Sequence, residues 1–323
     1  MRAVHPDVAA VVEAARRAGT PALGALPPEA ARLSYAESRR ALQAPFAPVA
    51  VRQDLTIPGP GGALALRLFR GVPSGALLPC LVFLHGGGWV LGNLETHEGI
   101  CRHIAAAAQC CVVAVDYRLA PEHPFPAAVD DGAAALRWVA AHAGELEIDP
   151  GRIAVGGDSA GGNLAAVLAL MARDASLPPC IYQMLLYPVT DLGMSGESYE
   201  RVIDGLPLTA GAMRYFIDLY APHEADRLDW RASPLRAASL YGAPPALVLT
   251  CGHDPLCSEG QLYAARLERE GVPVTALHLS DQAHGILNMG KAIGAVPGIL
   301  DFAAAALRQA WRDGGADGRK RSP

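Results

Sequence analysis

Residues 157–161 read Gly-Asp-Ser-Ala-Gly, the only G-x-S-x-G sequence in the chain. The apolar run before it, RIAVGG at 152–157, predicts a strand, and AGGNLAAVLALMARDA at 160–175 predicts a helix. A serine on a sharp strand-to-helix turn projects its hydroxyl from the sheet, and the crowded turn requires small neighbours. Ser159 is therefore a candidate nucleophile. The alternative is a glycine-rich turn that contains a serine by chance.

Three consecutive glycines form a second candidate element. Gly86, Gly87 and Gly88 lie in LHGGGW at 84–89, directly after the strand-like run CLVFL. Glycines let backbone amides approach a ligand closely. Together with the N–H of Ala160, such amides could bind the oxyanion that forms when a serine attacks a carbonyl group. The alternatives are a flexible loop or a phosphate cradle, but no G-x-x-x-x-G-K-[ST] sequence supports the latter.

A serine nucleophile needs a base and an acid that orients the base. In sites of this type, the acid and then the histidine follow the serine along the chain. His284 lies in a loop of small residues after the last predicted strand, and Asp254 follows the strand ALVLTCG. Asp281 is a rival acid. The remaining histidines after the serine fit less well, because they lie in a strand, in a long insertion or beside the acid: His278, His223 and His253.

The elements that must position these residues alternate between strands and helices. Apolar strand-like runs at 80–85, 110–117, 152–157, 182–188, 246–252 and 274–280 are separated by helical segments. Such alternation predicts an α/β fold with a mostly parallel sheet and helices on both faces. The near-continuous apolar character of the strands indicates burial on both sides.

Two stretches interrupt this alternation and suggest a helical cap over the carboxyl ends of the strands. We expect residues 1–45 to form its N-terminal part and residues 191–235 to form an insertion. The catalytic domain then comprises 46–190 and 236–315, and 316–323 form a flexible tail. The alternative is that the insertion is an ordinary surface loop with no part in a cap.

Composition excludes several classes of protein. The 323 residues are 51% hydrophobic and carry a net charge of −5, which argues against a nucleic-acid partner. The sequence has no apolar run long enough for a membrane helix and no secretory leader, so we expect a cytoplasmic protein. Seven cysteines without C-x-x-C spacing predict free thiols rather than a zinc site.

Taken together, these residues resemble the hormone-sensitive-lipase-like carboxylesterases, a group of α/β-hydrolases with a GDSAG elbow. The matching segments occur in the family's order over about residues 50–310, and the N-terminal helices fit the family's cap. They are HGGGW (85–89), DYRLAPEHPFPAAVDD (116–131), GDSAGGN (157–163), YP (187–188), DPL (254–256) and HG (284–285). The resemblance implies the α/β-hydrolase fold.

The resemblance also implies a role for each matching residue. Ser159 would be the nucleophile, His284 the base and Asp254 the orienting acid. Gly86, Gly87, Gly88 and Ala160 would form the oxyanion hole, Trp89, Asp158 and Ile286 would border the substrate, and Asp116, Arg118 and Glu122 would support the loop behind the site. The family often has a charged pair at Cys257 and Ser258 and an aromatic residue at Ile286.

The expected activity is hydrolysis of short- to medium-chain acyl esters through an acyl-enzyme, without a metal or an organic cofactor. The same triad could serve a deacetylase, an amidase or a lipase. Some relatives in plants bind hormones without turnover, but that function needs a damaged triad. The partner is a small-molecule ester, and family members often form dimers, so a homodimer is one expected assembly.

Overall fold

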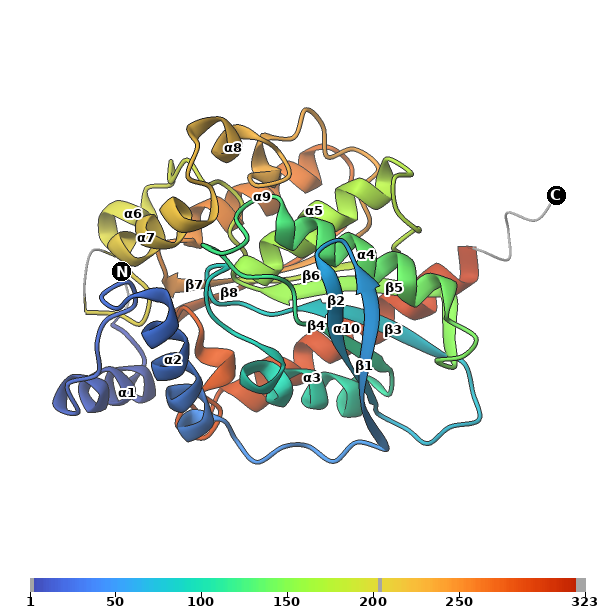
Figure 1. Ribbon diagram of the computed structural model, residues 1–323, viewed down its shortest axis with the longest axis horizontal. Coiled ribbons are helices and arrows are strands. Elements are labelled where there is room, and N and C mark those ends of the chain that lie inside the picture. The colour runs from blue at the N-terminus through green and yellow to red at the C-terminus, as the bar shows by residue number, and fades with distance from the viewer. Residues whose placement is uncertain (1–2, 203–204, 318–323) are drawn as a thin grey trace.

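The central element of the protein is a single mixed sheet. The computed structural model describes residues 3–202 and 205–317. In this part of the chain, eight strands form the sheet in the order β1-β2-β4-β3-β5-β6-β7-β8 (Figure 1). The strands are β1 (Val51–Gly59), β2 (Gly62–Arg70), β3 (Leu78–Leu84), β4 (Cys111–Val115), β5 (Ile148–Asp158), β6 (Gln183–Leu186), β7 (Ala246–His253) and β8 (Val274–Ala283).

The sheet is parallel from β4 to β8 and antiparallel where β2 pairs with β1 and β4. All five residues of β4 and all four of β6 are buried, because helices cover both faces of the sheet. Continuous apolar strands of this kind are typical of parallel sheets. The predicted α/β architecture is therefore confirmed.

Two layers of helices enclose the sheet (Figure 1). Helices α3 (Leu94–Ala108) and α10 (Val296–Asp317) pack together on one face. Helices α4 (Ala127–Ala141), α5 (Ala160–Arg173) and α9 (Cys257–Arg269) cover the other. Helix α5 is apolar on every side and almost wholly buried, so its position beneath the site is firmly set.

The remaining helices lie at the left and at the top of Figure 1. They are α1 (Pro6–Arg17), α2 (Pro28–Leu42), α6 (Ser198–Arg201), α7 (Ala210–Tyr220) and α8 (Glu224–Leu228). The hydroxyl of Tyr215 on α7 donates to the carbonyl oxygen of Leu26 over 2.9 Å, which links the two predicted parts of the cap. The division into a cap and a catalytic domain remains a prediction. Helix α10 continues to Asp317, and 318–323 of the expected tail lie outside the described residues.

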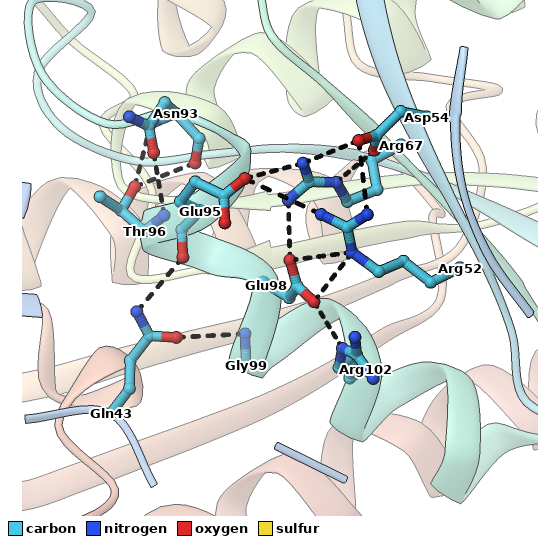
Figure 2. Close-up of polar contacts among 10 residues, drawn as sticks. All are labelled: Gln43, Arg52, Asp54, Arg67, Asn93, Glu95, Thr96, Glu98, Gly99 and Arg102. Atoms are coloured by element: carbon cyan, nitrogen blue, oxygen red, sulfur yellow. Dashed lines mark hydrogen bonds and ion pairs between the residues drawn. The ribbon is translucent and has the colours of Figure 1, made fainter. Parts of the chain in front are cut away.

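Strands β1 and β2 were not anticipated from the sequence. They form an antiparallel hairpin joined at Gly59–Gly62, and β1 is the exposed edge of the sheet. A charged cluster fastens this hairpin to α3 (Figure 2). The Arg67 guanidinium donates to Asp54 over 2.6 Å and to Glu98 over 2.7 Å, while Arg102 donates to Glu98 over 2.6 Å. Because Arg67 and Glu98 are both buried, their pairing restrains the position of α3.

Candidate active site

The candidate residues lie at the carboxyl ends of four parallel strands. The glycine loop 86–88 follows β3, Ser159 follows β5, Asp254 follows β7 and His284 follows β8. In parallel sheets these ends meet at one edge, where ligand sites commonly form. The structure therefore brings together residues that are far apart in the chain, such as Ser159 and His284, which are separated by 125 positions.

Ser159 occupies the sharp turn between β5 and α5. Its backbone has φ 57° and ψ −119°, a conformation that L-residues seldom adopt. The turn is held by a hydrogen bond from its N–H to the carbonyl oxygen of Leu186, at 2.8 Å. A Cβ atom on Gly157 or on Gly161 would overlap the carbonyl oxygen of Leu84. The requirement for small residues around the serine follows from this close approach.

His284 connects the serine to the acid. Its Nε2 lies 2.8 Å from Ser159 Oγ, and its Nδ1 lies 2.8 Å from Asp254 Oδ2. Asp254 is completely buried, and its Oδ1 accepts a hydrogen bond from the N–H of Leu256 at 2.8 Å. An ionised carboxylate can only accept, so the imidazole carries its proton on Nδ1 and leaves Nε2 to accept from the serine hydroxyl.

Three backbone amides of the glycine loop and the elbow have no acceptor among the described residues. Among the described residues, the N–H groups of Gly87, Gly88 and Ala160 donate to no protein oxygen. Gly87 and Gly88 have φ of 121° and 60°, which glycine adopts at little cost. Ala160 is the first residue of α5, where amides lack partners within the helix. These groups can bind a developing oxyanion.

Gly86 differs from the expectation for the oxyanion hole. Its N–H donates to Asp158 Oδ1 over 2.9 Å and is not available to a substrate. His97 of α3 approaches the same carboxylate, and its Nε2 lies 3.3 Å from Asp158 Oδ1. Burial alone would raise the pKa of Asp158, but His97 and the Gly86 amide lower it overall. Asp158 is therefore an anionic anchor for the glycine loop, and it also borders the cavity.

A buried histidine completes the support of this loop. His85 stacks on the ring of Tyr117 at a centroid distance of 4.2 Å, and the Tyr117 hydroxyl donates to the His85 carbonyl oxygen over 2.7 Å. Burial lowers the pKa of His85 to about 3, so this side chain is neutral. It holds the loop in place and does not serve as a base.

A cavity opens above Ser159. Its empty space, including the opening to solvent, is about 490 Å³. Tyr35 and Arg39 of α2 and Met213 and Phe216 of α7 line it together with Ser159 and His284. Nothing in the sequence marked the α2 residues, because their contribution arises only when the N-terminal segment folds back over the strand ends.

Comparison with known proteins agrees with this geometry. The model of a family described as alpha/beta hydrolase fold matches residues 81–288. The chain belongs to the alpha/beta hydrolase family. The predicted fold and the resemblance to carboxylesterases of this family are confirmed.

Relatives of this hydrolase are named as ester hydrolases. An ethyl acetate hydrolase of Pseudomonas putida is 37% identical over 95% of this chain and 99% of its own. A carboxylic ester hydrolase of Mycobacterium tuberculosis is 46% identical over 73% of this chain, and this match spans 64% of that relative's length. The crystal structure of a thermostable esterase from Pseudomonas putida superposes with a TM-score of 0.92 at 35% identity, covering 96% of this chain and 98% of the other. These similarities confirm the predicted class of enzyme, a carboxylic ester hydrolase.

Two residues expected to border the substrate lie elsewhere in the hydrolase. Trp89 is fully buried and stacks on Tyr220 of α7, with ring centroids 4.3 Å apart. Ile286 is also fully buried, in the core beneath α3 and α10. Neither side chain lines the cavity above Ser159. Their apolar bulk is used to pack α7 and the loop after β8, not to form a pocket wall.

The rival acid Asp281 and the strand residue His278 do not join the site. His278 lies on β8 with Nδ1 at 3.0 Å from Thr250 Oγ1. Asp281 precedes the end of β8, and its carbonyl oxygen accepts from the N–H of His5 at 2.8 Å. Neither is a hydrogen-bond partner of His284 or Ser159 among the described residues.

Two of the three residues expected to support the loop after β4, Arg118 and Glu122, form ion pairs. Arg118 Nε lies 2.9 Å from buried Asp131, and Glu122 pairs with Arg32 of α2 over 2.6 Å. The hydrogen bond from Arg32 lowers the pKa of Glu122 to about 2. This pair joins the loop to α2, which lines the cavity.

Among the described residues of the hydrolase, no three His, Cys, Asp or Glu side chains are arranged to hold a metal ion. No helix in that part of the chain is both long and apolar enough to cross a membrane. The seven cysteines are free thiols, as predicted.

Proposed function

We propose that this hydrolase is a serine carboxylesterase that cleaves short- to medium-chain acyl esters through an acyl-enzyme. The observation that carries the proposal is the single imidazole of His284, which spans 2.8 Å to Asp254 and 2.8 Å to Ser159. Nucleophile, base and orienting acid in hydrogen-bond contact form the arrangement that activates a serine.

The first half of the reaction acylates the serine. His284 Nε2 takes the hydroxyl proton as Ser159 Oγ attacks the ester carbonyl carbon. The carboxylate of Asp254 holds the imidazole in the required tautomer and stabilises the imidazolium that results. The tetrahedral intermediate collapses when His284 returns the proton to the alcohol, and the C–O bond of the ester breaks.

The unpaired amides of Gly87, Gly88 and Ala160 are suited to the oxyanion of both tetrahedral intermediates. By comparison with other oxyanion holes, each such donor is worth about 3 kcal/mol in the transition state. In the second half, water attacks the acyl-enzyme with His284 again as the base. Release of the carboxylic acid restores Ser159.

The size of the acyl group is inferred from the cavity walls. Seven apolar side chains line the cavity that contains Ser159: Leu23, Leu91, Pro207, Leu208, Met213, Phe216 and Met289. A confined apolar space of this kind suits a short or medium chain. We further propose that 1–45 and 191–235 act as a cap, because both supply these walls. The homodimer and the cytoplasmic location remain predictions.

The test is hydrolysis of p-nitrophenyl esters from acetate to laurate by the wild type and by Ser159→Ala. We expect the rate to peak at short or medium chains in the wild type and to vanish in the variant, while circular dichroism shows both folded. A parallel series of p-nitroanilides separates an esterase from an amidase. A folded wild type without turnover on any ester would contradict the proposal and favour ligand binding alone.

A further inference from the structure

An arginine that pairs with no described residue lies in the wall of the cavity above Ser159. Arg39 belongs to α2 and is only 8% exposed. Its Nε is buried without a hydrogen-bond partner, and its guanidinium forms no hydrogen bond or ion pair with any described residue. By contrast, Arg32 on the same helix forms an ion pair with Glu122 and hydrogen bonds to two carbonyl oxygens.

The surroundings of Arg39 hold the guanidinium but do not neutralise it. Its central carbon lies 4.7 Å from the ring centroid of Tyr35, one turn earlier on α2. This cation–π contact orients the planar group but supplies no hydrogen-bond acceptor. Both side chains line the same cavity as Ser159 and His284. The guanidinium donors therefore border the space where a substrate of Ser159 would lie.

A buried cation without an acceptor is costly, because desolvation is not offset by pairing. A ligand that supplies the missing acceptor offsets this free energy of desolvation. The planar fork of arginine matches a carboxylate, which accepts two parallel hydrogen bonds. Burial in a cavity strengthens the interaction over that of an exposed pair.

We propose that Arg39 forms a subsite for a carboxylate on the substrate, so that the enzyme prefers esters that carry a second, anionic group. This inference rests on the proposed esterase function and adds the class of substrate. The other charged or titratable groups at the cavity are Asp158, His284 and Tyr35. Asp158 is held by Gly86 and His97, and it forms no pair with Arg39. Its negative charge limits the anionic subsite to the α2 side of the cavity.

The test compares esters that differ only in a carboxylate or a neutral carboxamide. One pair, monoethyl succinate and ethyl succinamate, places the group on the acyl side. The other, 3-acetoxypropanoate and 3-acetoxypropanamide, places it on the alcohol side. For at least one pair, we expect wild-type kcat/KM to favour the carboxylate by about tenfold or more, as hydrogen bonds to a charged group suggest.

The ratio of kcat/KM for the carboxylate ester to kcat/KM for the carboxamide ester is also measured in Arg39→Gln and Arg39→Lys. Arg40→Gln is the matched control, because Arg40 is the exposed neighbour on α2. We expect a ratio near one in Arg39→Gln, an intermediate ratio in Arg39→Lys and the wild-type ratio in Arg40→Gln. Asp204 lies outside the described residues but is close in sequence to Pro207 of the cavity wall. Asp204→Asn is therefore included, to test whether this carboxylate and not a substrate pairs with Arg39.

Several results would overturn the subsite. These are a wild-type ratio near one for both pairs, a preference that survives Arg39→Gln, or a preference that appears only in Asp204→Asn. Turnover of the carboxamide esters tests the proposed esterase function separately. Its presence without a carboxylate preference refutes the subsite alone, whereas no turnover of any of the four esters refutes the function as well.

Discussion

Replacement of Asp254 by asparagine tests the geometry of the site most directly. The N–H of Leu256, 2.8 Å from Oδ1, requires an acceptor and would hold the amide oxygen of the asparagine at that position. The amide NH₂ would then face His284 Nδ1, where Oδ2 now lies at 2.8 Å. A donor at that point forces the proton of the imidazole onto Nε2, so His284 could no longer accept the proton of Ser159.

The size of the effect follows from this change of tautomer. In serine hydrolases with the same arrangement, an equivalent substitution lowers kcat about ten-thousandfold. At about 1.36 kcal/mol for each factor of ten, the loss corresponds to about 5.4 kcal/mol of transition-state stabilisation. Because Asp254 is completely buried and asparagine has nearly its shape, we expect the fold to remain.

The assay is steady-state hydrolysis of p-nitrophenyl butyrate by Asp254→Asn, with thermal unfolding measured in parallel. Asp281→Asn is the matched control, since Asp281 was the rival acid in the sequence and, among the described residues, forms no hydrogen bond with His284. We expect the control to stay within about twofold of the wild type. A folded Asp254→Asn that retains more than a tenth of the wild-type kcat would refute the reasoning.

Three further predictions concern packing and pH. Gly161→Ala should prevent normal folding, because its Cβ would overlap the Leu84 carbonyl oxygen, and a wild-type melting temperature would contradict this. Trp89→Phe should cost about 1–3 kcal/mol of stability by losing part of the stack on Tyr220, yet leave the acyl-chain profile unchanged; a shifted profile would place Trp89 in the pocket after all. Burial raises the pKa of Glu259 from 4.5 to about 8, so the folded state holds a proton that the unfolded state releases, and stability should fall as pH rises from about 4.5 to 8. Between pH 5 and pH 8, the free energy of unfolding measured with urea should fall less in Glu259→Gln than in the wild type. An equal fall in both proteins would be evidence against a protonated Glu259.

The residues of the site could be predicted because each lies in a recognisable local sequence pattern. The elbow around Ser159 needs small neighbours within two positions, and the glycine loop lies directly after a strand. Asp254 and His284 follow strands in a fixed chain order. Short-range constraints of this kind are visible in a single sequence, since the steric requirement and the residue that meets it are neighbours.

Other features depend on contacts between distant segments, so no local sequence pattern predicts them. Nothing nearby distinguishes Arg39 from Arg40, yet one is buried against the cavity and the other is exposed. Trp89 adjoins the glycine loop but is turned into the core by Tyr220 of α7. The Gly86 amide is removed from the oxyanion hole by Asp158, 72 residues away. The edge hairpin β1–β2 is a different case, because the alternation of Leu64, Leu66 and Leu68 is typical of a strand and could have predicted it.

The first helix is fastened to backbone that is synthesised much later. The N–H of His5 donates to the carbonyl oxygen of Asp281 over 2.8 Å, and Asp7 accepts from the N–H of Gly294 over 3.0 Å. On a translating ribosome, these partners do not exist until most of the chain has emerged. Helix α1 therefore cannot reach its final position until β8 and the segment after it have been synthesised. Because His284 lies in the same late segment, we expect ester turnover to begin only after nearly the whole chain has been synthesised.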